Sequence, residues 1–139
     1  PEADTKITKM SNQDWYSFFV ACSTVLSQKF AADIRVGERC SWATFDSIEC
    51  GAHYWSGPLL SEADLLPTYT RDGGPWRQPF LFESLAHVVI PRFFGIESGG
   101  AADYAYKSGV HDLEALSAKL NELGIQHRKT DLMLEIKLY

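Results

Sequence analysis

The stretch that most constrains the fold is Asp112 to Tyr139, where the spacing of apolar residues changes from that of a helix to that of a strand. Leucines first recur at intervals of three and four residues, at Leu113, Leu116, Leu120 and Leu123. This spacing places them on one face of a helix. Asp112 is a favourable N-cap, and Gly124 suits the left-handed residue that ends a helix.

The last residues of the chain alternate with the period of a β-strand. Apolar residues fill every second position, at Leu132, Leu134, Ile136 and Leu138. One face of the strand is therefore apolar and the other largely polar. A helix and a strand that each have one apolar face are most simply satisfied by packing on a shared sheet. We expect a C-terminal helix over about 112–123 and a strand over about 131–138.

The N-terminal part predicts a second amphipathic helix. Ser11 and Asp14 have the spacing of a capping box. Apolar residues then recur at helical spacing, at Trp15, Phe18, Phe19, Cys22, Val25, Leu26 and Phe30. An aromatic stripe of this kind is usually buried core, so we predict a core helix over about 12–30. Residues 1–10 are polar and are interpreted as a leader that need not be native.

The middle of the chain favours short strands. Ile48, Cys50, Ala52 and Tyr54 alternate with Glu49, Gly51, His53 and Trp55, which predicts a strand over 48–55. A chain of 139 residues is expected to form one domain with its own core. The predicted fold is therefore α+β: a single domain over 11–139, with both helices packed on a mostly antiparallel sheet.

Cysteine usage and hydropathy suggest the compartment. Cys22, Cys40 and Cys50 cannot all pair within one chain, and such a sparse, odd set fits a reducing environment. No apolar run approaches the roughly 20 residues needed to cross a bilayer. We expect a cytoplasmic protein without a membrane partner.

Negative charge is concentrated in the middle of the chain. Between Asp46 and Asp103 there are eight acidic and three basic residues, so this segment carries the whole net charge of −5. Such a surface repels nucleic-acid phosphates and attracts a basic protein. We therefore expect no nucleic-acid partner and a basic protein as partner.

The same segment combines carboxylates with aromatic residues, a combination suited to protein recognition. Charge steers the encounter, and aromatic side chains supply desolvated contacts. The candidate partner-binding residues are the carboxylates Asp46, Glu49, Glu62, Asp64 and Asp72, with the aromatics Trp55, Tyr69 and Trp76. The glycine- and proline-rich stretch from Thr68 to Pro79 is either a binding loop or a surface loop without a role in binding.

Catalytic alternatives have weaker patterns. Cys50 and His53, with Cys40, could suggest zinc, but a second Cys/His pair with short spacing is missing. On a strand, Cys50 and His53 would point to opposite faces, which disfavours a Cys–His nucleophile. We expect no metal, cofactor or catalytic residue. A small hydrolase or transferase using Cys50, or a carboxylate with a histidine, is the alternative; a small-ligand-binding or scaffold domain is another.

In its size, its charge and the general style of its sequence, the chain resembles bacterial toxin-immunity proteins. The features concerned are the opening helix from Met10-Ser11-Asn12-Gln13-Asp14-Trp15, the acidic midsection, and the terminal unit from Leu123-Gly124-Ile125 to Leu134-Glu135-Ile136. The resemblance implies a small acidic inhibitor that covers the active site of a basic, nuclease-type toxin. Carboxylates would then mimic phosphates in a basic cleft, with Trp55 or Trp76 as anchor.

Overall fold

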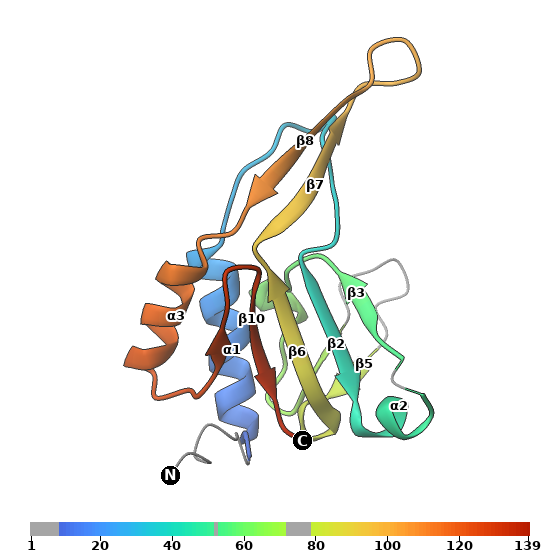
Figure 1. Ribbon diagram of the computed structural model, residues 1–139. Helices are drawn as coiled ribbons and strands as arrows, with labels where there is room; N and C mark the ends of the chain where they lie inside the picture. Colours follow the sequence, from blue (N-terminus) through green and yellow to red (C-terminus); the bar gives the residue numbers. More distant parts are fainter. Residues whose placement is uncertain (1–8, 52, 72–78) are drawn as a thin grey trace.

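An antiparallel sheet of five strands lies at the centre of the computed structural model, which describes residues 9–51, 53–71 and 79–139 (Figure 1). In spatial order the strands are β3 (Trp55–Gly57), β2 (Cys40–Thr44), β6 (Leu85–Pro91), β10 (Met133–Lys137) and β9 (Arg128–Lys129). The chain is a single α+β domain, as its sequence predicts.

One face of this sheet is covered by two helices, α1 (Asn12–Val25) and α3 (Leu113–Glu122), which lie side by side in Figure 1. The main core includes the fully buried Trp15, Phe18, Val88, Ile90, Leu116, Leu120, Leu134 and Ile136. Because side chains alternate along a strand, the residues between them on β6 and β10 belong to the opposite face. Within the described residues, Figure 1 shows no helix over that face.

The terminal elements follow the sequence closely. The Asp112 side chain caps α3 by accepting a hydrogen bond from the amide of Ala115 at 3.0 Å, and Gly124 has a φ of 71°. Strand β10 pairs with β6 and β9 on either side. The predicted C-terminal helix and strand are confirmed.

The N-terminal helix is shorter than the predicted range of about 12–30. Ser11 and Asp14 form the expected capping box, but α1 ends at Val25. The three residues after Leu26 are exposed, so no buried face continues the stripe. Phe30 packs instead against Phe94, with ring centroids 6.4 Å apart, and so belongs to a separate apolar contact.

Strands β1 (Arg35–Val36), β7 (Phe93–Ser98) and β8 (Ala105–Val110) form an arm that extends away from the central sheet (Figure 1). Nearly all residues of β8 are exposed, and Gly109 is the exception. A Cβ at Gly109 would lie 2.4 Å from the ring of Phe94, so this strand crosses the ring only because glycine has no side chain.

The prediction of a strand over 48–55 is wrong for the described residues before Trp55. Helix α2 (Phe45–Glu49) occupies that region, and the strand β3 begins only at Trp55. The Ser47 amide donates to Thr44 Oγ1 at 3.1 Å, and the Thr44 amide donates to Ser47 Oγ at 2.9 Å. This reciprocal cap starts a helix where residue propensity alone favours a strand.

The remaining elements are short and lie between α2 and β6 in the sequence. They are the 3-10 turns η2 (Glu62–Asp64) and η3 (Phe82–Ser84) and the paired strands β4 (Tyr69–Arg71) and β5 (Pro79–Leu81). Phe80 of β5 packs edge-on against Trp42 and Trp55. This contact joins β4 and β5 to the central sheet.

Candidate functional site

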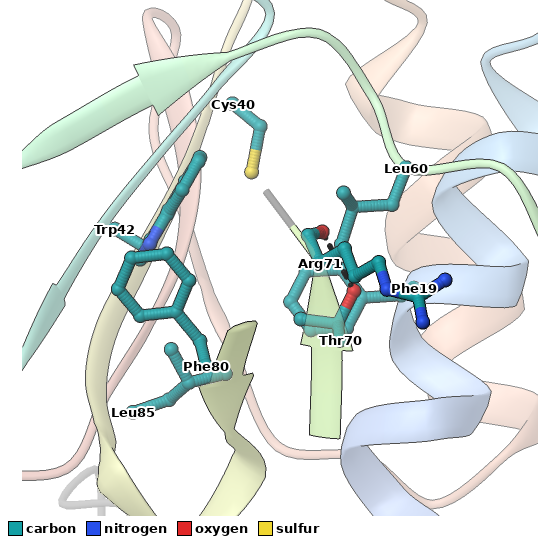
Figure 2. A pocket seen from close by; sticks show the side chains of 8 residues that line it. All are labelled: Phe19, Cys40, Trp42, Leu60, Thr70, Arg71, Phe80 and Leu85. Carbon is teal, nitrogen blue, oxygen red and sulfur yellow. Dashed lines mark hydrogen bonds between the residues drawn. The ribbon is translucent and has the colours of Figure 1, made fainter. Parts of the chain in front are cut away.

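A small internal cavity lies between α1, β2, β4 and β5 (Figure 2). Its volume is about 10 Å³, and Figure 2 shows the Cys40 sulfur directed into it. Such a space has room for about one water molecule, so it cannot admit a substrate. We interpret it as a packing void of the core.

A surface hollow of about 440 Å³ brings together two of the sequence-predicted binding residues, Asp46 and Trp55. Asp46 comes from α2 and is exposed, whereas Trp55 comes from β3 and is half-buried. The hollow is also lined by Thr44, Ser47, Cys50, Pro79, Phe80, Leu81 and Ser84. A carboxylate and an indole therefore share one open surface.

Trp55 is held firmly at this hollow by other aromatic rings. Its ring centroid lies 4.9 Å from that of Phe80 and 4.7 Å from that of His53, both in edge-on contacts. A side chain fixed in this way loses little conformational entropy when it contacts a partner. Trp55 is thus suited to act as a rigid anchor.

The other predicted carboxylates differ in their surroundings. Glu49 is exposed on the same short helix as Asp46, and Glu62 is exposed on η2. Asp64 is only 8% exposed, and its Oδ2 accepts hydrogen bonds from the amide and hydroxyl of Ser61 at 3.2 and 3.0 Å. Asp64 therefore stabilises its own turn.

Three further predicted residues complete the comparison with the sequence. Tyr69 is half-buried on β4 and does not line the hollow. Asp72 and Trp76 lie outside the described residues. Their assignment to a binding surface stays a prediction.

The acidic residues of the middle segment are divided between the elements around the central sheet and the arm. Glu97 and Asp103 belong to the β7–β8 arm, which extends away from α2 in Figure 1. The Tyr104 hydroxyl donates to Glu97 Oε2 at 2.7 Å, and Asp103 Oδ1 accepts from the Gly100 amide at 2.7 Å. Among the described residues, Asp46 of α2 is the acid that lines the hollow together with Trp55.

The cysteines occupy two different environments. Cys22 and Cys40 are buried free thiols; desolvation raises the pKa of Cys22 well above its usual value and that of Cys40 to about 12. Cys50 is an exposed free thiol at the rim of the hollow. The neighbouring His53 ring packs against Trp55. Among the described residues, no group of three or more His, Cys, Asp or Glu side chains is arranged to hold a metal ion.

A hydrogen-bonded network that the sequence analysis missed lies on the opposite face of the central sheet. His87 Nε2 is 2.5 Å from Glu135 Oε1, and His87 Nδ1 is 2.5 Å from the Tyr54 hydroxyl. The Tyr54 hydroxyl in turn lies 3.2 Å from that of Tyr139. Glu135 Oε2 lies 3.6 Å from Arg128 Nη1. We call Tyr54, His87 and Glu135 the Tyr–His–Glu relay.

A neutral His87 satisfies the donors and acceptors of this network in the following pattern. An ionised Glu135 can only accept, so the proton on His87 lies at Nε2 and Nδ1 is free to accept from the Tyr54 hydroxyl. The Tyr139 hydroxyl can then donate to the Tyr54 oxygen. Desolvation by burial is the main cause that raises the pKa of Tyr54 to about 12.

The strand register explains why the sequence alone did not reveal this network. Alternation correctly places Glu135 on the polar face of its strand, yet the residue is buried, with only 4% exposed. His87 and Glu135 are 48 positions apart, and they meet because β10 pairs with β6. The sequence signal is a carboxylate between Leu134 and Ile136, but its partner depends on a pairing that alternation does not specify.

Comparisons of the chain with protein-family models, with curated proteins and with solved structures found no match. Within the described residues, no helix has both the length and the apolar character required to cross a membrane.

Proposed function

We propose that this protein is a non-catalytic binding protein of the immunity type, which neutralises a basic, nuclease-type bacterial toxin in the cytoplasm. The observation that supports it best is the hollow in which Asp46 and Trp55 meet beside Glu49. Its free, buried thiols Cys22 and Cys40 are compatible with a reducing compartment.

The two kinds of side chain have separate tasks in this mechanism. The exposed carboxylates of Asp46 and Glu49 attract a cationic cleft and occupy positions that phosphates otherwise fill. Trp55 contributes a large apolar ring that is already fixed by Phe80 and His53. Rigid aromatic anchors of this kind carry much of the energy in protein interfaces.

Charge reversal provides the test. The double variant Asp46→Lys/Glu49→Lys should slow association with a cognate basic, nuclease-type toxin by at least about 10-fold at low salt, and it should weaken the dependence on salt. The control is Glu122→Lys on α3, a side chain that is 71% exposed, and it is compared with each of the single reversals Asp46→Lys and Glu49→Lys. Association rates would be measured by surface plasmon resonance, together with protection of toxin-expressing cells.

Trp55→Ala is expected to act mainly on dissociation. Loss of a buried aromatic anchor should speed dissociation by roughly 30-fold, which corresponds to about 2 kcal/mol. Circular dichroism would confirm that the variants are folded. Equal effects of the α2 and α3 charge reversals, or binding that is indifferent to salt, would rule out the proposed surface.

A further inference from the structure

We propose that Tyr54 is a nucleophilic tyrosine, activated by His87 and Glu135, which accepts a phosphoryl group from an activated phosphate compound. The Tyr–His–Glu relay lies on the face of the sheet opposite α1 and α3. It is built from residues other than those of the hollow that contains Asp46 and Trp55. The inference therefore does not depend on the proposed immunity function.

The relay has the three parts that an activated hydroxyl needs. The nucleophile is within hydrogen-bond reach of a base, and the base is oriented by a third group. Tyr54 contacts one ring nitrogen of His87 at 2.5 Å, and Glu135 contacts the other at 2.5 Å. In the neutral ring, donation from Nε2 to Glu135 leaves Nδ1 as the atom that can take the proton from the phenol.

Burial holds the base and the carboxylate in place while the nucleophile remains accessible. The side chains of His87 and Glu135 are only 12% and 5% exposed. Tyr54 and Tyr139 are 36% and 47% exposed. Part of the Tyr54 side chain is thus open to solvent.

A base is needed because the phenol is a weak acid in this setting. The pKa of Tyr54 is raised to about 12, so almost no phenolate exists near neutral pH. The same is true of a serine hydroxyl, which becomes a nucleophile only when a histidine removes its proton during the attack. His87 is positioned for that role.

The charges around the relay favour an anionic electrophile. Arg128 lies directly opposite Glu135 in the sheet and compensates its charge, with 3.6 Å between Nη1 and Oε2. Lys137 lies opposite His87, and its Nζ is 4.7 Å from the centre of the Tyr139 ring. Among the described residues named here, Arg128 and Lys137 supply two positive charges against the one carboxylate of Glu135, in a protein with a net charge of −5. Cations stabilise the oxygens of a phosphoryl group in transfer.

The bond changes can be written in full. The Tyr54 oxygen attacks phosphorus, and the new O–P bond forms as the bond from phosphorus to the leaving group breaks. The leaving group departs with the electron pair of that bond. The phenolic proton moves to His87 Nδ1, and the resulting imidazolium is stabilised by the Glu135 carboxylate. The product is O-phosphorylated Tyr54, and no oxidant or reductant is required.

The chain contains internal controls for this chemistry. Tyr106 is more exposed than Tyr54, at 61% against 36%. Tyr104 is 53% exposed and donates to the Glu97 carboxylate at 2.7 Å, so it has a carboxylate partner without an intervening histidine. If exposure or a carboxylate alone produced reactivity, these two residues would react at least as fast as Tyr54.

The test uses a fluorophosphonate, whose P–F bond breaks to release fluoride. The intact chain would be incubated with the probe, and modification at each tyrosine would be followed by peptide mass spectrometry. We expect Tyr54 to react at least about 100-fold faster than Tyr106 or Tyr104, since a positioned base typically contributes this much. His87→Gln and Glu135→Gln should remove most of this advantage, whereas Tyr106→Phe should leave the rate at Tyr54 unchanged.

The pH profile separates base catalysis from simple exposure. The groups that face His87 are Tyr54, Glu135 and Lys137, with Tyr139 and Arg128 at the edge of the network. With a base that removes the phenolic proton, the rate at Tyr54 should level off well below pH 12, whereas the rates at the control tyrosines should continue to rise with pH.

Two further measurements test the proposal even if the His87→Gln or Glu135→Gln variant fails to fold. Lys137→Gln should slow phosphorylation of Tyr54 by the anionic donor phosphoramidate several-fold and leave acetylation of Tyr54 by the neutral reagent N-acetylimidazole unchanged. If Tyr54 in the unmodified sequence reacts no faster than Tyr106, the relay does not activate it. If Lys137→Gln slows both reagents equally, the assignment to phosphoryl donors is wrong.

Discussion

Arg92 donates two hydrogen bonds to the carboxylate of Glu114, from Nη1 to Oε1 at 2.9 Å and from Nη2 to Oε2 at 2.6 Å. Arg92 lies where β6 passes into β7, and Glu114 lies in the first turn of α3. The Arg92 Nε also donates to the carbonyl of Asp131. One guanidinium therefore joins the base of the arm, helix α3 and the turn before β10.

This pairing should be visible in the titration of Glu114. The hydrogen bond from Arg92 is the main reason that the pKa of Glu114 falls to about 2. A carboxyl with a depressed pKa in the folded state contributes stability above its unfolded pKa, near 4.3, and this contribution is lost as the pH falls through 2. Arg92→Gln should return the pKa of Glu114 toward 4.3, measured by carbon-detected NMR. An unchanged pKa would show that the ion pair does not form in solution.

The sequence predicted those elements whose apolar pattern is long and uninterrupted. α3 and β10 follow directly from the leucine spacing and the alternation after Gly124. The prediction failed over 48–55 because five residues of helix are too short to show a period. There, hydrogen bonds between Thr44 and Ser47 decide the conformation.

For the candidate sites too, the sequence predicts which residues are close along the chain but not which residues strand pairing brings together. Asp46 and Trp55 are nine positions apart and could be grouped by composition, and they do line one hollow. The sequence analysis grouped Asp64 with them because of its charge. In the structure Asp64 is buried and accepts a hydrogen bond from the Ser61 hydroxyl in its own turn. The Tyr–His–Glu relay joins three strands or their ends through pairings that depend on register, which no local pattern in the sequence specifies.

The reciprocal cap at α2 predicts a measurable loss of stability on substitution. Ser47→Ala removes the acceptor of the Thr44 amide in a buried setting, with Ser47 only 7% exposed. We expect a loss of about 1–2 kcal/mol in the free energy of unfolding, measured by urea denaturation. The control is Ser56→Ala, an exposed serine that should change it by less than about 0.5 kcal/mol. Equal losses would mean that the cap does not stabilise α2.

We expect that glycine is needed at position 124 because of its backbone conformation, and not because a side chain would clash with its neighbours. Its φ is +71°, and a Cβ at this position would meet nothing within 4 Å. Gly124→Ala should therefore destabilise the protein by about 1–2 kcal/mol through backbone strain alone. Gly100→Ala is the control, because its Cβ would contact only Asp103 Oδ1 at 3.9 Å. A thermal melt that shows no difference between the two variants would contradict this explanation.

The cysteines should separate into one reactive thiol and two protected ones. Cys50 is exposed, whereas Cys22 and Cys40 are buried and have raised pKa values. Ellman's reagent should therefore modify one thiol quickly in the folded protein and the other two only on unfolding. If iodoacetamide at neutral pH modified Cys50 much faster than a free cysteine, the alternative of a Cys50 enzyme would gain support over the immunity proposal.

Alkaline pH should weaken the fold through Tyr54. Its pKa is about 12 in the folded protein against about 10 for an unperturbed phenol, so the unfolded chain loses this proton first as the pH rises. The stability due to this shift is fully present below pH 10 and disappears as the pH approaches 12. Urea denaturation between these pH values should show a falling free energy of unfolding, and Tyr54→Phe should reduce the slope. Tyr106→Phe serves as the control, and an identical loss of slope in both variants would place the titrating group elsewhere.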